Sequence, residues 1–338
     1  MGGVVFVFIG GVVGAGFATG QELWLFFGRY GSVGILGILL SGLMLGAFGA
    51  EILGWATKER TAEHGSLFSR LLGKRMGLGA DLMLSCFLFV VVAVMEAAGG
   101  EVGKQFFRLP VNWGIFVLIL LASLSLWQKN GIIRASSLLV PLLITLMLLI
   151  SLASFTLPSQ RVALLPDPPL PWWLAAFFYA SYNLLLVFSA LCALAPNLLS
   201  LREGKLSSWL ASGILTCLNL VLFAALSRQG GAGQLPILSL ARRLGPLFGW
   251  AYLLALFFAI FTSLLAATWG MGRRLSGKLP EPVVEVLILI LAWPLSRFGF
   301  AKIVASCYPL FGSFGFLLLL LLWSGSVKRN RVALLWIK

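Results

Sequence analysis

Apolar runs long enough to cross a lipid bilayer recur along the whole chain, and this feature constrains the fold more than any other. A helix of about 20 apolar residues spans roughly 30 Å of hydrocarbon. Inside that layer every backbone N–H and C=O group needs an internal partner, so only helices or a closed barrel can cross it. The runs are continuous and do not alternate with period two, which favours helices. The sequence therefore predicts an all-α integral membrane protein.

Composition supports the same class. Charged residues make up 11% of the chain and apolar residues 60%, whereas a soluble domain carries about 25% charged residues. The net charge of +14 raises the question of a nucleic-acid partner. The basic residues, however, lie in short loops between the apolar runs, which is typical of membrane orientation. We therefore expect a lipid bilayer and a small-molecule substrate as partners, and no nucleic acid; the sequence does not indicate an oligomeric state.

Ten membrane-spanning helices are predicted. Placing both termini in the cytoplasm puts most of the 25 basic residues in cytoplasmic loops, as the positive-inside rule requires. No basic segment precedes the first run, so we expect no cleavable signal peptide and predict a multi-pass protein of the cell inner (plasma) membrane. Two short additional helices are expected near 62–72 and 236–244. The predicted spans are 2–28, 31–56, 78–107, 110–127, 133–156, 171–197, 207–228, 246–272, 281–297 and 301–324.

The ten spans divide into two halves of nearly equal length. Residues 1–157 would form a first five-helix repeat, and 171–326 a second. The Pro-rich connection 158–170 joins them, and 327–338 would be a cytoplasmic tail. Because each half has an odd number of spans, the halves lie in opposite topology, which is the inverted-repeat plan of many secondary transporters.

The first span contains a cluster of glycines that predicts an interruption. Gly14 and Gly16 lie within the run 9–20, and each glycine costs a helix about 1 kcal/mol relative to alanine. Unwound backbone in a membrane must line a cavity or be buried in protein. It exposes carbonyl groups that suit a cation and N–H groups that suit a carboxylate. The alternative is that these glycines only allow close helix packing.

A polar island in the sixth span predicts a second interruption. The run 177–183 contains two residues typical of a helix N-terminus, Ser181 and Asn183. Its position matches that of the glycine break in the first half, as in inverted-repeat transporters. We therefore predict breaks near Gly14–Gly16 and Ala180–Asn183; the alternative is that these polar side chains only bond neighbouring helices. The predicted substrate-binding residues in this island are Tyr179, Ser181, Tyr182 and Asn183.

Acidic residues inside spans are further candidates. Glu96 lies deep in the third span and must face a cavity or a partner. We predict that Glu96 is substrate-binding, either as the counter-ion of an amine or as a proton site; the alternative is a structural hydrogen bond. Glu22 follows the glycine break directly and is either functional or a vestibule residue, whereas Glu101 is expected to pair with Lys104. In the eighth span, Thr262 and Ser263 either bond their own helix or supply oxygens to a cation.

These motifs resemble a known family. The run 11–22, with its Val-Gly-Ala-Gly at 13–16, and the run 179–183 look like the YkvI-type bacterial membrane proteins. Val-Gly-Ala-Gly at 13–16 in a broken first helix, the ten spans in two inverted halves and the Ala-x-x-Thr-Ser pattern at 259–263 resemble the amino acid–polyamine–cation superfamily with the LeuT fold. The resemblance covers nearly the whole chain.

The resemblance implies particular ligand positions. A sodium site between spans one and eight would use the carbonyl oxygens of Gly10, Val13 and Ala259 and the hydroxyls of Thr262 and Ser263. The carboxylate of a substrate would meet backbone N–H groups near Ala15 and Gly16. Phe17 stands where members with a second sodium carry a side-chain amide, which argues against a second ion; Phe17 is also a predicted substrate-binding residue. No other cofactor is implied.

The leading functional hypothesis is a secondary transporter, sodium-coupled, for an amino acid or related small amine. Proton-coupled or uncoupled transport by the same fold, or a membrane sensor that transports nothing, remains an alternative. A membrane-embedded enzyme is not expected, because the chain has one histidine, His64, and two aspartates, Asp81 and Asp167. The four cysteines form no C-x-x-C pair, and no phosphate-binding G-x-x-x-x-G-K-[ST] motif is present, so a primary pump is not expected either.

Overall fold

The computed structural model describes residues 2–59, 64–107, 110–126, 129–160, 170–198, 200–229, 235–275 and 279–335, and within these ranges every regular element is a helix. The α-helices are α1 (Gly2–Val12), α2 (Ala15–Thr19), α3 (Gln21–Phe27), α4 (Gly34–Lys58), α5 (His64–Leu72), α6 (Lys74–Phe107), α7 (Val111–Ser125), α8 (Lys129–Ala153), α9 (Trp172–Leu194), α10 (Leu201–Gln229), α11 (Pro236–Leu244), α12 (Pro246–Leu275), α13 (Glu281–Ser296) and α14 (Phe300–Leu335). Three short 3-10 helices are η1 (Gly28–Val33), η2 (Ser154–Thr156) and η3 (Ala195–Asn197).

Six helical stretches in the described part of the chain are long and apolar enough to cross a membrane. Three shorter apolar stretches accompany them, at Gly2–Val12, Val111–Ser125 and Val140–Thr156. A multi-pass helical membrane protein is therefore supported, while the count of ten spans in a 5+5 inverted repeat stays a prediction. The six stretches are Gln21–Lys58, Lys74–Phe106, Trp172–Leu194, Leu201–Gln229, Pro246–Gly272 and Phe300–Gly325.

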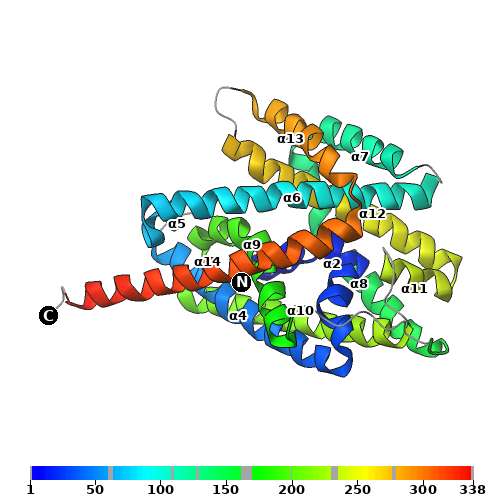
Figure 1. Ribbon diagram of the computed structural model, residues 1–338, viewed down its shortest axis with the longest axis horizontal. Helices are drawn as coiled ribbons and strands as arrows, with labels where there is room; N and C mark the ends of the chain where they lie inside the picture. The colour runs from blue at the N-terminus through cyan, green and yellow to red at the C-terminus, as the bar shows by residue number, and fades with distance from the viewer. Residues whose placement is uncertain are drawn as a thin grey trace.

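The long helix α6 divides the molecule (Figure 1). Helices α7, α12 and α13 pack against it and against one another. On the other side, α4 packs against α9 and α10, and α1 lies against α9 and α10. Helix α14 crosses both groups, contacting α9 and α6, and its C-terminal end projects beyond the other helices (Figure 1).

Small residues bring the helices of the second group close together. On α4, Gly42 and Gly46 face Thr216 and Trp209 of α10, and any Cβ at either glycine would collide with them. The Ser208 hydroxyl of α10 donates to the Gly46 carbonyl at 2.9 Å. Close glycine contacts with interhelical hydroxyl bonds are how helices associate in lipid, where no hydrophobic force draws them together.

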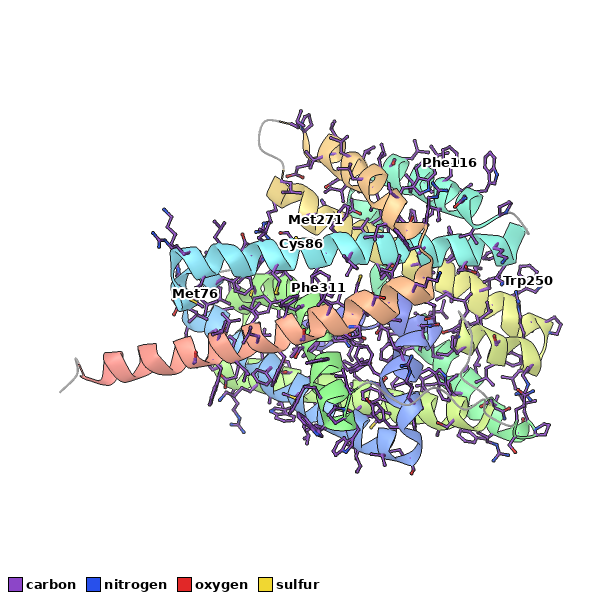
Figure 2. All side chains as sticks on the ribbon, viewed as in Figure 1. Met76, Cys86, Phe116, Trp250, Met271 and Phe311 are labelled. Carbon is purple, nitrogen blue, oxygen red and sulfur yellow. The ribbon has the colours of Figure 1, made fainter. Side chains whose placement is uncertain are left out.

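Large apolar side chains cover much of the outer surface. Phe116 on α7 and Trp250 on α12 are 49% and 53% exposed and point away from the body (Figure 2). Phe311 on α14 instead faces α6, with its ring centroid 5.0 Å from that of Phe87 (Figure 2). Lipid solvates such outward apolar side chains without cost, so this surface fits a membrane-embedded protein.

The two predicted helix breaks have different outcomes. The break in the first span is confirmed, because α1 ends at Val12 and α2 begins at Ala15. The predicted break at Ala180–Asn183 is wrong, because α9 runs without interruption from Trp172 to Leu194. This helix contains no glycine or proline, so continuing it costs little. Asn183 does not start a new helix; its Nδ2 donates to the Tyr179 carbonyl one turn earlier, at 2.9 Å.

The two short helices agree with expectation. Helix α11 spans Pro236–Leu244, as predicted. Helix α5 covers His64–Leu72, and residues 62–63 of its predicted range lie outside the described residues. Most of the Pro-rich connection, 161–169, also lies outside them. Residues 327–335 of the predicted tail continue α14.

Candidate functional site

The interruption of the first span has two parts. Gly14 is extended (φ −86°, ψ −171°) and separates α1 from α2. Gly20 has φ +79°, a left-handed conformation that favours glycine, and separates α2 from α3. The Gly14 amide donates to the Val12 carbonyl at 2.8 Å and not to that of Gly10, four residues back. The Gly10 carbonyl therefore lacks its normal helical donor, which makes it available to a ligand.

A buried carboxylate lies against this interruption. Glu22, in the first turn of α3, is 2% exposed. The Tyr182 hydroxyl of α9 donates a short hydrogen bond to Glu22 Oε2. Gly16 makes room for the carboxylate, because a Cβ at position 16 would overlap the Glu22 carboxyl group. The glycine is thus required by side-chain packing, in addition to any role in unwinding the helix.

Aromatic rings surround the Glu22–Tyr182 pair. The Tyr182 ring stacks on Phe26 with centroids 5.4 Å apart, and it lies 4.8 Å from the ring of Tyr308 on α14. Tyr179 meets Tyr182 edge-on at 5.5 Å. The Asn219 amide of α10 donates to the Tyr179 hydroxyl at 3.4 Å. Four elements, α3, α9, α10 and α14, therefore converge on one polar centre within an apolar core.

Helices α11 and α12 hold α2 in place. The Tyr252 hydroxyl of α12 donates a short hydrogen bond to the Ala18 carbonyl at the end of α2. The Ile237 side chain of α11 packs on Gly20, where a Cβ would come within 2.9 Å of it. A carbonyl freed by the break is thus satisfied by a side chain of a neighbouring helix, as backbone within a membrane requires.

The predicted sodium ligands lie on α1, on α12 and, for Val13, between α1 and α2. A Cβ on Gly14 would lie 4.0 Å from Ser263 Oγ, so α12 approaches the break at this residue. Thr262 Oγ1 donates to the Ala259 carbonyl at 3.2 Å, within its own helix. Gly10 faces Val140 of α8, whose Cγ2 would lie 3.7 Å from a Cβ at position 10. Val13 is buried between α1 and α2.

The other predicted binding residues lie on α2 and on α9, and those of α9 belong to the helix that carries Tyr179 and Tyr182. Ala15 begins α2 and Phe17 is buried within it. Ser181 is 1% exposed, and its hydroxyl has no hydrogen-bond partner among the described residues. The Asn183 Oδ1 is likewise without a partner in this part of the chain. The α9 residues thus lie in one region although the helix is continuous.

Glu96 lies away from that cluster. It is fully buried, and neither carboxyl oxygen has a hydrogen-bond partner in the described ranges. On α6, Phe87 faces Tyr308 at 6.3 Å between ring centroids. Glu96 is nine residues further along, which places it about 180° around the helix. It shares the face of Gly99 and Gly103, which pack against α7. Glu96 therefore lies on the face of α6 opposite Phe87, while its neighbour Met95 reaches Gly14, where a Cβ would lie 3.8 Å from Met95 Cε.

A second polar cluster ties α5 to three other helices. His64 Nδ1 lies 3.1 Å from Ser189 Oγ of α9, and His64 Nε2 lies 3.5 Å from Asp81 of α6. Arg274 of α12 forms an ion pair with Asp81 and approaches His64 Nε2 at 3.4 Å. Burial, together with the Arg274 charge, lowers the pKa of His64 to about 4. His64 is therefore neutral at pH 7.

Sequence reasoning named Glu22 but did not assign its role, and it missed Asn219, Tyr252 and Tyr308. Each missed residue carries one polar group in an apolar run, which is a signal too common to single out. Their role depends on which helices pack together.

The fold and the site define a multi-pass helical membrane protein with an interrupted first helix. Its sequence is similar to two proteins of Bacillus subtilis (strain 168). The uncharacterized protein YyaD is 28% identical over 321 residues, 93% of each chain. The uncharacterized membrane protein YkvI is 28% identical over 316 residues, 91% of each chain. No family model matches the chain.

The fold is also that of a solved transporter. Crystal structures of two mutants of a manganese transporter from Eremococcus coleocola match with a TM-score of 0.56. The match covers 96% of this chain and 76% of the transporter chain, at 17% sequence identity. At this identity the likeness establishes the fold alone.

Proposed function

We propose that the protein is a secondary transporter of an amino acid or related small amine, with sodium as the coupling ion. The observation that carries the proposal is the interrupted first helix beside a buried carboxylate. The break frees the Gly10 carbonyl, and Glu22 lies against Gly16 in the same region. Discontinuous helices that combine exposed backbone groups with intramembrane ionisable side chains mark solute pathways in transporters.

The fold supports transport as the activity. The chain shares its fold with a protein described as a manganese transporter, and its motifs resemble the YkvI-type proteins. A transition-metal cargo is less favoured by the donors present. No group of three or more His, Cys, Asp and Glu side chains occurs in the described part of the chain, whereas the site holds one carboxylate surrounded by phenol rings.

Sodium is favoured by the approach of α12 to the break. Ser263 Oγ lies close to Gly14, and the Gly10 carbonyl lacks its helical donor. Hydroxyl and carbonyl oxygens are hard ligands that suit a small cation. Proton-coupled or uncoupled transport is the alternative if the ion has no effect, and a sensor is the alternative if no solute crosses the membrane.

Uptake by purified protein in proteoliposomes tests the proposal. Labelled amino acids and amines are offered with an inward sodium gradient, and then with an equal potassium gradient. Sodium-stimulated uptake of at least one amine-bearing solute is expected, and protein-free liposomes give the background. Manganese uptake measured in the same vesicles provides the contrasting case. Transport of manganese without any amine-bearing solute would contradict the assigned substrate class.

A further inference from the structure

Glu22, when ionised, places a buried negative charge on α3 that the described residues do not balance. Its carboxylate accepts a hydrogen bond from Tyr182, and no ion pair to Glu22 occurs in the part of the chain that the structure describes. An ionised carboxylate in an apolar core is costly unless it is paired. The neutral phenol of Tyr182 donates one hydrogen bond to this carboxylate but does not neutralise its charge. The site therefore calls for a cation or a proton.

The surroundings of Glu22 suit an organic cation. The rings of Tyr182 and Tyr308 lie 4.8 Å apart, and Phe26 stacks on Tyr182 at 5.4 Å. Faces of Tyr and Phe rings attract ammonium groups, with more effect in a desolvated site. The Tyr308 hydroxyl is buried and has no hydrogen-bond partner among the described residues. It offers an oxygen that an N–H group of a bound ammonium would satisfy.

We propose that Glu22, together with the rings of Tyr182 and Tyr308, forms the binding site for the ammonium group of the transported solute, and that the Tyr182 hydroxyl occupies this carboxylate when no solute is bound. The inference rests on the proposed transport function and narrows it to solutes that carry a positive charge. On binding, the ammonium displaces the Tyr182 hydroxyl from Glu22 Oε2. The phenol then turns away from the carboxylate, and its ring remains as a wall of the site.

The location links binding to the helix break. Glu22 belongs to α3, and the carboxyl group lies against Gly16 of α2. Tyr182 belongs to the continuous helix α9, and Tyr308 to α14. Replacing the Tyr182–Glu22 bond by an ammonium–Glu22 pair changes what holds α3 to α9. Solute binding would therefore change how the interrupted first helix packs against α9.

Thermal stability of the detergent-purified protein, measured with charged and neutral ligands of equal shape, tests the inference. The probes are choline with its neutral isostere 3,3-dimethylbutan-1-ol, and butylamine with butan-1-ol. A ligand that binds the native state raises the melting temperature. At least one ammonium probe is expected to raise it, while its neutral counterpart has no effect. Glu22→Gln is expected to weaken that ammonium response at least tenfold in ligand concentration.

Matched variants separate a binding role from a structural one. Glu51→Gln makes the same chemical change at a half-buried position of α4 and is expected to leave the response intact. Tyr308→Phe keeps the ring and removes its oxygen, so we expect weaker binding of butylamine, which has N–H groups, but not of choline, which has none, with an unchanged melting temperature of the ligand-free protein. If Glu22→Gln does not fold, Tyr308→Phe alone still decides the question.

Three results would overturn the inference. The first is a lack of response of the wild-type protein to both ammonium probes. The second is an ammonium response that Glu22→Gln preserves. The third is stabilisation by Glu22→Gln together with ligand binding that is independent of charge, which would assign Glu22 to a proton. Uptake of an uncharged solute independent of Glu22 would leave transport standing and remove the ammonium site. Ammonium binding that depends on Glu22, without any uptake, would support the ammonium site and contradict the proposed transport function.

Discussion

The phenol hydroxyl of Tyr182 on α9 donates a hydrogen bond to the carboxylate of Glu22 on α3, across 160 residues of sequence. The bond joins the segment that follows the glycine break to a helix that has no break. Gly16 lies against the same carboxyl group and leaves the space that it fills. The three residues form one packed unit, so a change in any of them is expected to affect the others.

Gly16→Ala tests the packing of this unit. The added methyl group would overlap the Glu22 carboxyl, so the side chain or α2 must move. We expect a loss of about 1–3 kcal/mol in stability and weaker solute binding, measured by melting temperature and by uptake. Gly213→Ala on α10 is the control, because no atom lies within 4 Å of its Cβ position, and it should be neutral. Equal behaviour of the two variants would show that Gly16 is not under packing constraint.

Two tyrosine-to-phenylalanine changes should differ in their effect on stability. Tyr182→Phe removes the donor from the buried Glu22 carboxylate and is expected to cost about 1–3 kcal/mol. Tyr308→Phe removes a buried hydroxyl that has no partner among the described residues, so a change below about 1 kcal/mol is expected. Denaturation of both variants in the absence of solute gives the comparison. A larger loss for Tyr308→Phe would reveal a partner of its hydroxyl.

The coupling ion is tested on α12. Thr262→Ala combined with Ser263→Ala removes the two predicted hydroxyl ligands of sodium, of which Ser263 approaches the break, and is expected to abolish the sodium dependence of uptake without unfolding the protein. Thr268→Ala is the matched control, because its hydroxyl bonds the Leu264 carbonyl of the same helix at 2.8 Å, and it should keep that dependence. Wild-type uptake that ignores sodium would instead favour proton-coupled or uncoupled transport.

His64 predicts a pH dependence of stability. The pKa of His64 is lowered from 6.5 to about 4, first by burial and then by Arg274. The unfolded chain therefore binds this proton at a higher pH than the folded chain does. The resulting stability is fully present above pH 6.5 and is lost as the pH falls from 6.5 to about 4, by up to about 3 kcal/mol.

The chain has one histidine, so His64→Gln isolates this contribution. Denaturation at a series of pH values should show a smaller loss for the variant between pH 6.5 and 4. Parallel curves for the two proteins would mean that His64 titrates alike in the folded and unfolded states.

Glu96→Gln tests whether the second buried acid binds solute. Because Glu96 lies about 180° around α6 from the face that meets Tyr308, we expect the variant to keep its affinity for the ammonium probes. Uptake measured across a pH series then determines whether Glu96 carries a coupling proton, since the glutamine cannot titrate. Loss of ammonium binding at every pH would place Glu96 in the solute site after all.

The sequence alone determined the features that depend on residues close together in the chain. Continuous apolar runs predicted membrane-spanning helices, since backbone groups in lipid must be satisfied within the segment. The glycines around Gly14 predicted the first break because each weakens the helix at its own position, and α11 was predicted to the residue. The predicted break in α9 failed because Ser181 and Asn183 were interpreted by residue type, whereas Asn183 bonds its own helix.

Only the tertiary structure decided which side chains share a site. Glu22 and Glu96 are both buried acids in apolar runs, and no local signal separates them. Helix packing places Glu22 against Tyr182 and leaves Glu96 on the face of α6 opposite Phe87, because the orientation of each helix depends on all of its neighbours. The chemistry of each residue could be assessed from the sequence, but its partners are fixed by contacts between segments far apart in the chain.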